Sequence, residues 1–201
     1  GDIGDKGFSP VPEGLDYDLW TGPAPKRPFT ENLVHYNWHW FRTWGTGEAL
    51  NNSLHEIDVC RWALGLGYPD QVQSSGGRFF HNDDWEFFDY QHAVYKYNDG
   101  KTITWEGNSC NGQPVLGHGR GALIYGTKGS ILLTRNGHTL FDIKGKEIDK
   151  VNESEASATM NTVGAGNLDV QHFVNFFDGI QGKDKLHSPI QEGAISANMG
   201  H

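Results

Sequence analysis

Cysteine is scarce in this chain of 201 residues, which contains only Cys60 and Cys110. Two cysteines cannot form the disulfide framework that stabilises small secreted domains, and they are too few for a zinc site without histidine ligands. We interpret Cys60 as a small buried side chain rather than as half of a disulfide. Stability therefore depends on a hydrophobic core, and the length suffices for one domain with such a core.

Positive charge is also in deficit, because 16 Lys and Arg face 25 Asp and Glu, for a net charge of −9. No basic run is longer than Lys26-Arg27. Nucleic acids and anionic membrane surfaces attract clusters of Lys and Arg, so we expect neither as a partner. No apolar run approaches the roughly 20 residues that span a bilayer, and no signal peptide is visible in this chain.

The motifs of several enzyme classes are missing. The glycine-rich stretch "GHGRGALIYG" at 117–126 runs into an expected strand rather than a helix, so it lacks the helix N-terminus that binds a pyrophosphate. No G-x-G-x-x-G follows a strand, and no G-x-S-x-G occurs. The acidic stretch at 83–89 could supply paired carboxylates, but solvated charge in a turn is the default interpretation. We therefore expect no dinucleotide-binding domain in this chain.

A metal site is not expected either. His35 and His39 stand four residues apart and could form half of a site, which His55 or His172 would complete. No carboxylate lies between the first two histidines as it does in zinc-protease helices.

Proline, glycine and aromatic residues are abundant near the start. We interpret residues 1–45 as an arm packed on a single α+β domain that spans 46–201. Five prolines between residues 10 and 28 exclude a long helix, although Asp16 to Trp20 could form one turn. The arm is too apolar to be a free tail.

Three helices and six strands are expected after the arm. Helices are predicted at about 47–64, ended by Gly65, at 169–180, and from a Ser188 cap with Pro189 in its first turn. Residues 149–167 are polar and lack periodicity, which predicts a loop. Alternating strands are predicted at 71–80, 89–98, 101–109, 120–126, 129–134 and 138–143.

These strands, separated by hairpin turns, predict an open, mainly antiparallel sheet with helices on one face. Ile103 and Trp105 alternate with polar neighbours, as expected where one face is buried. The segments "ALIY" and "SILL" are apolar on both faces. We infer a second covering of the sheet there, most simply another subunit.

One helix carries a candidate catalytic group. Asn51, His55 and Asp58 stand at i, i+4 and i+7, which would place them on one side of the helix. A neutral imidazole in a cleft can accept the proton of a hydroxyl, and Asn51 or Asp58 could orient its second nitrogen. The alternative is a structural histidine, with Asp58 paired to Arg61 at i+3.

The stretch "LVHYNWHWFRTW" at 33–44 is unusually aromatic. Aromatic faces stack on sugar rings, while histidine and asparagine bind hydroxyls, so His35 and one of Trp38 or Trp40 could position a sugar. The alternative is aromatic core beneath the arm.

Four segments occur in a recognisable order over residues 10–198. They are "GLDYDLWTGPAPKRPF", "WHWFRTWGTGEALNNSLHEIDVCRWALG", "GALIYGTKGSI" and "DVQHFVNFFDGIQGKDKLHSPIQEG". Together they resemble the C-terminal half of the Gfo/Idh/MocA oxidoreductases, in a sugar-active bacterial subgroup. The H-x-x-D-x-x-R-W run is the most specific part.

The resemblance implies an N-terminal Rossmann domain that holds NAD or NADP outside this chain. It implies a sugar or polyol substrate between the domains, and a homo-oligomer built through the free face of the sheet. The family's proton-transfer histidine maps onto His55. An aspartate is common four residues earlier, where this chain has Asn51, which favours a hydroxyl ligand there. Asp58 maps onto a residue that supports the histidine or the helix packing, and His172 onto a histidine of the late helix.

We therefore interpret the chain as the substrate-binding and oligomerisation domain of an NAD(P)-dependent sugar or polyol oxidoreductase, inactive by itself. Two alternatives stay open: the same domain of an NAD-dependent glycosidase, or a stand-alone carbohydrate-binding module. The compartment, bacterial cytoplasm or periplasm, also stays open.

Overall fold

The computed structural model describes residues 2–135, 137–152 and 168–201. The chain divides into two compact units, one of Gly1–Gly112 with Ile195–His201 and the other of Gln113–Ala194. We call these unit 1 and unit 2 and describe each by itself. Whether 46–201 forms the single domain expected from the sequence stays a prediction. None of the helices in the described ranges is long and apolar enough to cross a membrane.

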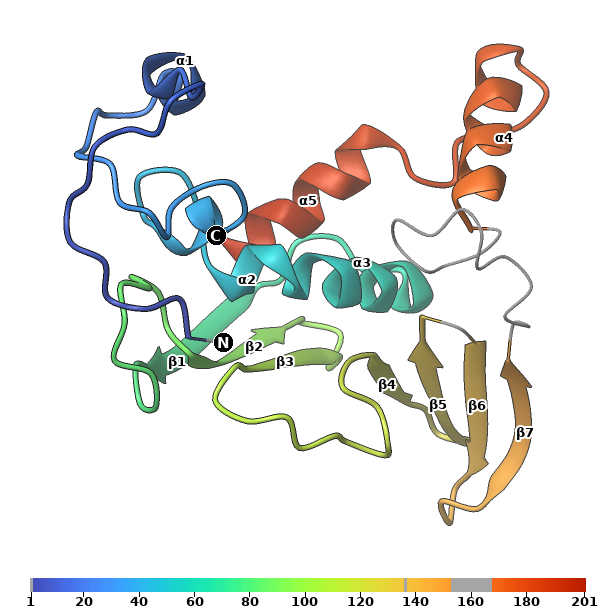
Figure 1. Ribbon diagram of the computed structural model, residues 1–201. Coiled ribbons are helices and arrows are strands. Elements are labelled where there is room, and N and C mark those ends of the chain that lie inside the picture. Colours follow the sequence, from blue (N-terminus) through green and yellow to red (C-terminus); the bar gives the residue numbers. More distant parts are fainter. Residues whose placement is uncertain (1, 136, 153–167) are drawn as a thin grey trace. The chain divides into compact units, whose positions relative to one another are not determined.

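Unit 1 contains short helices followed by a three-stranded antiparallel sheet in the order β1-β2-β3 (Figure 1). Its elements before the final helix are α1 (Tyr17–Thr21), η1 (Asn37–Trp40), α2 (Glu48–Asn51), α3 (Ser53–Leu64), β1 (Gln71–Gly77), β2 (Tyr90–Lys96) and β3 (Thr102–Asn108). The expected turn at Asn98–Gly100 joins β2 to β3, with Tyr97 and Lys101 hydrogen-bonded across it.

The core of unit 1 lies between this sheet and two helices. Ile103 and Trp105 are buried while their neighbours on β3 are exposed, as the alternation predicts. They pack with Ile57 of α3 and with Met199 of α5 (Ile190–Gly200), whose last residues belong to unit 1. The Tyr95 hydroxyl on β2 donates to the Met199 carbonyl at 2.8 Å, which ties the end of α5 to the sheet.

The helix predicted at 47–64 is interrupted at Asn52, between α2 and α3. Both Asn51 and Asn52 donate their side-chain amides to the Glu48 carboxylate, and the Ser53 hydroxyl donates to the Ala49 carbonyl. Short polar side chains of this kind compete with the helical hydrogen-bond pattern. The predicted end of the helix is confirmed, because Gly65 adopts the left-handed conformation and donates to the Arg61 and Trp62 carbonyls.

Unit 2 contains a four-stranded antiparallel sheet in the order β4-β5-β6-β7. Its elements are β4 (Ala122–Tyr125), β5 (Gly129–Thr134), β6 (Gly137–Asp142), β7 (Glu147–Asn152) and α4 (Leu168–Ile180), followed by the start of α5. The prediction of a loop from residue 149 is wrong for 149–152, which pair with β6; residues 153–167 lie outside the described residues.

The α+β class and the antiparallel pairing are therefore confirmed, with the strands distributed over two sheets that are not closed. Helix α5 begins at Ile190, one residue after Pro189, whose carbonyl accepts from Glu192. Residues 181–189 before α5 are not helical, so the prediction that Ser188 caps this helix is wrong.

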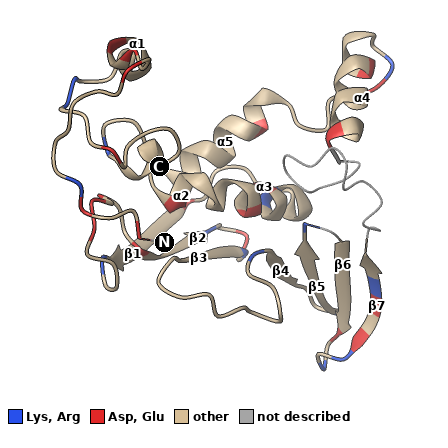
Figure 2. Ribbon diagram, viewed as in Figure 1, with Lys and Arg blue, Asp and Glu red and all other residues tan. Residues whose placement is uncertain are grey.

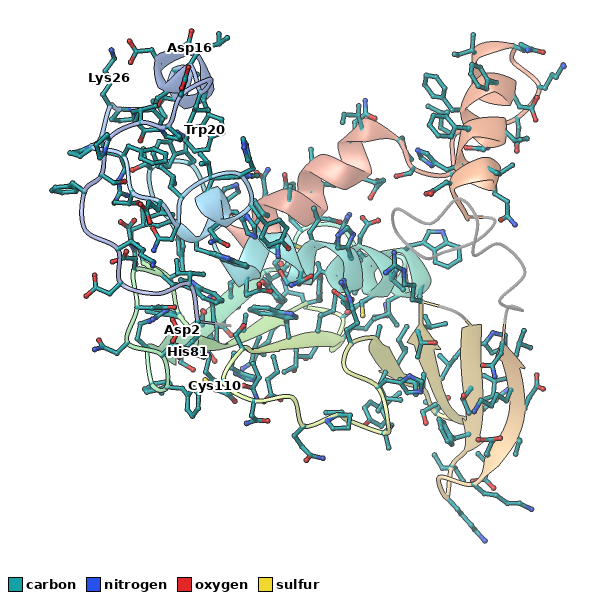
Figure 3. The ribbon with its side chains drawn as sticks, viewed as in Figure 1. Asp2, Asp16, Trp20, Lys26, His81 and Cys110 are labelled. Atoms are coloured by element: carbon teal, nitrogen blue, oxygen red, sulfur yellow. The ribbon has the colours of Figure 1, made fainter. Side chains whose placement is uncertain are left out.

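The arm forms one turn of helix where the sequence predicts it. The Asp16 carboxylate accepts from the Leu19 N–H and caps α1, and Lys26 pairs with Asp18 near it (Figure 3). Further along, Phe8 and Thr30 form an antiparallel bridge, and the Asn32 amide donates to the Ile3 and Gly4 carbonyls. The arm thus folds back on itself within unit 1 rather than extending as a tail.

Candidate functional site

His55 lies in the first turn of α3 with its side chain exposed. Its backbone N–H donates to the Asn52 carbonyl, but no hydrogen bond joins its ring to Asn51 or Asp58 among the described residues. Asn51 ends the preceding helix, half-buried, and its amide lies 3.4 Å from a Glu48 oxygen. The break at Asn52 therefore separates Asn51 from the helix that carries His55.

Asp58 has other partners than His55. The Ser196 hydroxyl of α5 donates to its carboxylate at 2.6 Å, and the Arg61 guanidinium lies 3.9 Å from it. Arg61 is only 2% exposed and also donates to Ser196 at 2.7 Å. This arrangement matches the alternative interpretation of the sequence, in which Asp58 pairs with Arg61 and supports helix packing. The imidazole of His55 takes no part in these contacts and is exposed on α3.

The aromatic stretch divides into exposed and buried members. His35, Tyr36 and Trp38 are exposed, whereas His39 and Trp40 are buried. Trp40 stacks on Trp85, with ring centroids 4.2 Å apart, so this indole belongs to the core of unit 1. Of the two tryptophans predicted to position a substrate, Trp38 alone is accessible in unit 1.

His39 is enclosed by aromatic rings. Tyr36, Trp38 and Trp40 contact it, with ring centroids 4.7, 5.2 and 3.9 Å away. Burial lowers the pKa of His39, against the opposing influence of the Tyr36 backbone and of Glu48. Its carbonyl accepts from Gly47 at the start of α2, so this histidine acts in packing and its partnership with His35 in a metal site has no support.

His172 is exposed on α4 in unit 2, where its ring contacts Phe173. His172 thus belongs to a different unit from the other candidate residues, which all lie in unit 1. In the described ranges, no group of three or more His, Cys, Asp or Glu is arranged to hold a metal ion.

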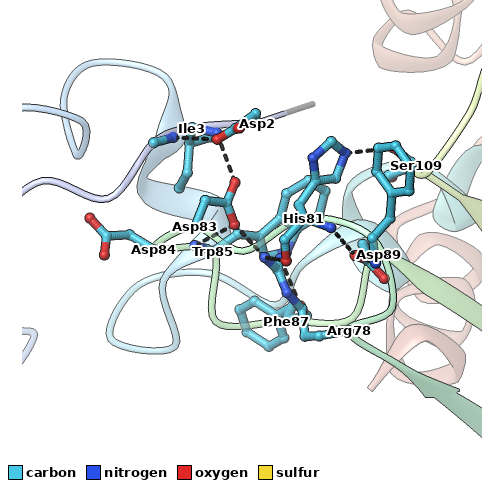
Figure 4. A network of polar contacts seen from close by, with 12 residues as sticks. Asp2, Ile3, Arg78, His81, Asp83, Asp84, Trp85, Phe87, Asp89 and Ser109 are labelled. Carbon is cyan, nitrogen blue, oxygen red and sulfur yellow. Dashed lines mark hydrogen bonds and ion pairs between the residues drawn. The ribbon is translucent and has the colours of Figure 1, made fainter.

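The acidic stretch at 83–89 forms a buried network that the sequence interpretation missed (Figure 4). Asp89 is 1% exposed and accepts from the backbone N–H groups of Phe79, Phe80 and His81 at 2.9–3.0 Å. Burial by itself would raise the pKa of Asp89, but these donors outweigh it and lower the pKa to about 2. The interpretation of the acidic stretch as solvated charge is therefore wrong for Asp89.

Asp83 is part of the same network. It accepts from the Ile3 and Trp85 N–H groups and pairs with Arg78, which also donates to the His81 carbonyl. These partners lower the pKa of Asp83 despite its burial. The network fixes the arm to the loop between β1 and β2. In the sequence, the presence of Arg78 shortly before the acidic residues could have indicated an ion pair there.

A nicotinamide dinucleotide does not fit the described residues. Its usual cradle needs parallel strands joined by a helix with a glycine-rich turn, whereas every strand pair of both sheets is antiparallel. The described chain can thus offer side chains to a substrate, but it builds no pyrophosphate site.

Comparisons with solved structures agree with this fold. An oxidoreductase from Thermotoga maritima is 18% identical, with a TM-score of 0.54 over 98% of this chain and 51% of that chain. A levoglucosan dehydrogenase in complex with NADH and levoglucosan is 16% identical, with a TM-score of 0.58 over 81% of this chain and 49% of that chain. At such identities the likeness concerns the fold.

The chain spans about half the length of the solved structures that it matches. A search of curated proteins gave no match. The family model described as "Oxidoreductase family, C-terminal alpha/beta domain" matches residues 4–162, which is most of the chain and includes the H-x-x-D-x-x-R-W run. The chain therefore belongs to the Gfo/Idh/MocA oxidoreductase family, as its C-terminal α/β domain.

Proposed function

We propose that this chain is the substrate-binding domain of an NAD(P)-dependent dehydrogenase that acts on a sugar or polyol. The observation that carries the proposal is the exposed imidazole of His55 on a helix that is held to α5 through Asp58 and Arg61. Family membership supports the reaction class, and the antiparallel pairing of both sheets supports the proposal that another domain binds the dinucleotide.

In this proposal His55 accepts the proton of a substrate hydroxyl as the carbon that bears it is oxidised. The hydride acceptor, NAD or NADP, supplies the redox chemistry from outside this chain. Exposed Trp38 and His35 offer an aromatic face and a hydrogen-bonding group to the sugar, and Asn51 offers an amide. Trp40 contributes by supporting this segment from the core.

The experiment is a dehydrogenase assay of the full-length protein with NAD⁺ and NADP⁺ against a panel of sugars and polyols. We expect turnover of at least one substrate, and a fall in kcat of about 10²- to 10⁴-fold in His55→Asn. His118→Asn, at an exposed histidine of unit 2, is the matched control and should keep full activity.

Binding of either dinucleotide to His55→Asn should stay unchanged. This control distinguishes the loss of the catalytic base from the unfolding of the variant. Undiminished turnover in His55→Asn would contradict the assigned role. The chain alone is expected to be inactive, and clear turnover by it would contradict the placement of the dinucleotide in another domain.

We also propose that the sheet of unit 2 contacts a second copy of this chain. The register places Leu123, Leu132 and Thr139 on one face and Ile124, Ile131 and Leu140 on the other. Leu132 and Thr139 are each 7% exposed, whereas the three side chains of the opposite face are only half-buried. An apolar sheet face of this kind supports a covering by another subunit.

A further inference from the structure

A cavity of about 400 Å³ lies in unit 1 between the arm and the loop that precedes β2. Its wall is formed by segments far apart in the sequence: Lys6, Gly7, Phe8, Arg27, Thr30, Phe41, Asp84 and Glu86. None of them is a candidate residue of the proposed dehydrogenase site. The volume falls within the range of small-molecule sites, which is about 300–1,000 Å³.

The charges of the wall are balanced. Arg27 donates to one Glu86 oxygen at 3.0 Å, and the Arg42 N–H donates to the other at 2.6 Å. The Lys6 N–H and the Asn32 amide both donate to one oxygen of Asp84, at 2.7 and 2.8 Å. Two cations and two carboxylates therefore face the cavity without a net charge, which disfavours an anion or a cation as its occupant.

These contacts hold the charged groups in place but leave some of their hydrogen-bond donors and acceptors unused. Every described contact of the Asp84 side chain goes to Oδ2, so Oδ1 can accept from a ligand. Arg27 lies over the Phe41 ring, 4.9 Å from its centroid, and uses one N–H on Glu86. A guanidinium has five N–H donors, so several can reach a ligand.

Thr30 lines the cavity but does not offer its hydroxyl to it. The residue is 5% exposed, and its hydroxyl oxygen is enclosed by the protein, without a hydrogen-bond partner among the described residues. The polar groups that a ligand can use are therefore those of Asp84 and Arg27.

Phe8 supplies an apolar wall at the opening. It is 76% exposed, although its backbone is held by the bridge to Thr30. An exposed aromatic ring on a fixed backbone, beside a neutral set of donors and acceptors, matches a neutral polyhydroxylated ring compound. We propose that this cavity is a binding site for a mono- or disaccharide, with Phe8 against the ring and Asp84 and Arg27 on its hydroxyls.

The test is a titration of the full chain with methyl β-D-glucopyranoside, followed by ¹H–¹⁵N NMR. It is run in a His55→Asn, Trp38→Ala background, so that failure of the proposed dehydrogenase site cannot be mistaken for failure of this one. We expect saturable shifts of the Gly7 and Phe8 amides. Phe8→Ala should weaken binding about tenfold through the lost ring contact, and Asp84→Asn about three- to tenfold because an amide oxygen is a weaker acceptor than a carboxylate.

Leu19→Ala is the matched control, because Leu19 is 78% exposed on the arm but does not line the cavity. Unchanged affinity in the control together with weaker binding in both cavity variants would support the proposal. The proposal would be overturned by unshifted Gly7 and Phe8 amides, by equal affinity in all three variants, or by saturation of these amides with inorganic phosphate instead. The two-dimensional spectra also report whether each variant is folded.

Discussion

At the scale of single residues, the ionised carboxylate of Asp89 stabilises the fold. Its buried carboxylate satisfies three consecutive backbone N–H groups in the turn after β1. The Cys110 thiol contacts the Asp89 carbonyl at 3.6 Å, so the same residue also holds the segment after β3. Asp89 thus organises two segments that a sheet alone would leave unconnected.

The stability of the protein should depend on pH through Asp89. A carboxyl group has a pKa of about 4 in the unfolded chain, and that of Asp89 is about 2 in the folded protein. The stabilisation is therefore fully present above pH 4 and is lost as the pH falls through 4 toward 2. Its size is about 2 kcal/mol. Urea unfolding of the wild type between pH 6 and pH 2.5 should show the loss.

In Asp89→Asn this part of the pH dependence should disappear and the protein should already be less stable at pH 6, because an amide oxygen is a weaker acceptor than a carboxylate. Asp5→Asn, at an exposed aspartate of the arm, is the control, and its free energy of unfolding should depend on pH as that of the wild type does. Equal acid sensitivity in Asp89→Asn and the wild type would show that other carboxyl groups are responsible.

For single residues, the sequence predicts which side chains are chemically able to take part in a site, but not how buried they are or which partners they bind. His55 was identified by its type and spacing, and its exposure agrees with the role assigned. Asp83 and Asp89 were missed because their partners are backbone N–H groups, which every residue has and no motif records. Trp38 and Trp40 could not be distinguished, since Trp40 is buried by its stacking on Trp85, which is 45 positions away in the sequence.

At the scale of secondary-structure elements, α3 is fixed by contacts with α5. Figure 2 shows few charged residues on these two helices, and the buried one that joins them is Arg61. Its guanidinium and the Asp58 carboxylate both bond the Ser196 hydroxyl, which is fully buried. The helix that carries His55 is thus held by polar contacts as well as by Ile57 in the core.

We therefore expect Ser196→Ala to lower the free energy of unfolding by about 1–3 kcal/mol, because it leaves a buried guanidinium without one of its partners. Ser188→Ala, at an exposed serine before α5, is the control with an expected change below about 0.5 kcal/mol. Chemical denaturation measures both. A Ser196→Ala protein as stable as the control would mean that the remaining contacts of Arg61 suffice.

Element boundaries were predictable where one residue dictates them. Gly65 ends α3 because only glycine adopts its left-handed conformation at no steric cost. The break at Asn52 and the strand β7 were missed for another reason. The first depends on side-chain competition by Glu48 and Ser53, and the second has exposed residues throughout, so neither leaves a periodic hydrophobic pattern.

At the scale of the whole molecule, the sheet face proposed to contact a second copy can be tested. We expect the full-length protein to be at least a dimer by light scattering, and Ile131→Lys to shift it toward the monomer. A lysine ammonium buried in an apolar interface costs several kcal/mol. Val72→Lys, at an exposed position of β1 in unit 1, should leave the oligomer intact.

Circular dichroism of both lysine variants shows whether Ile131→Lys still folds. A folded variant that stays as large as the wild type would exclude this face as the contact.

The class of the fold was accessible from the sequence because alternation in β2 and β3 and glycine at the turns are local signals. Division of the strands into two sheets was not, since it depends on pairings that no local pattern encodes.

The tie between Tyr95 and Met199 has a consequence for synthesis on the ribosome. The sheet of unit 1 is complete once Asn108 has been translated, yet Met199, which packs against its core, is made about ninety residues later. The nascent chain must therefore keep Ile57 and Tyr95 incompletely covered while all of unit 2 emerges. During this long interval part of the apolar core of unit 1 stays accessible, and transiently exposed apolar surface of this kind favours aggregation.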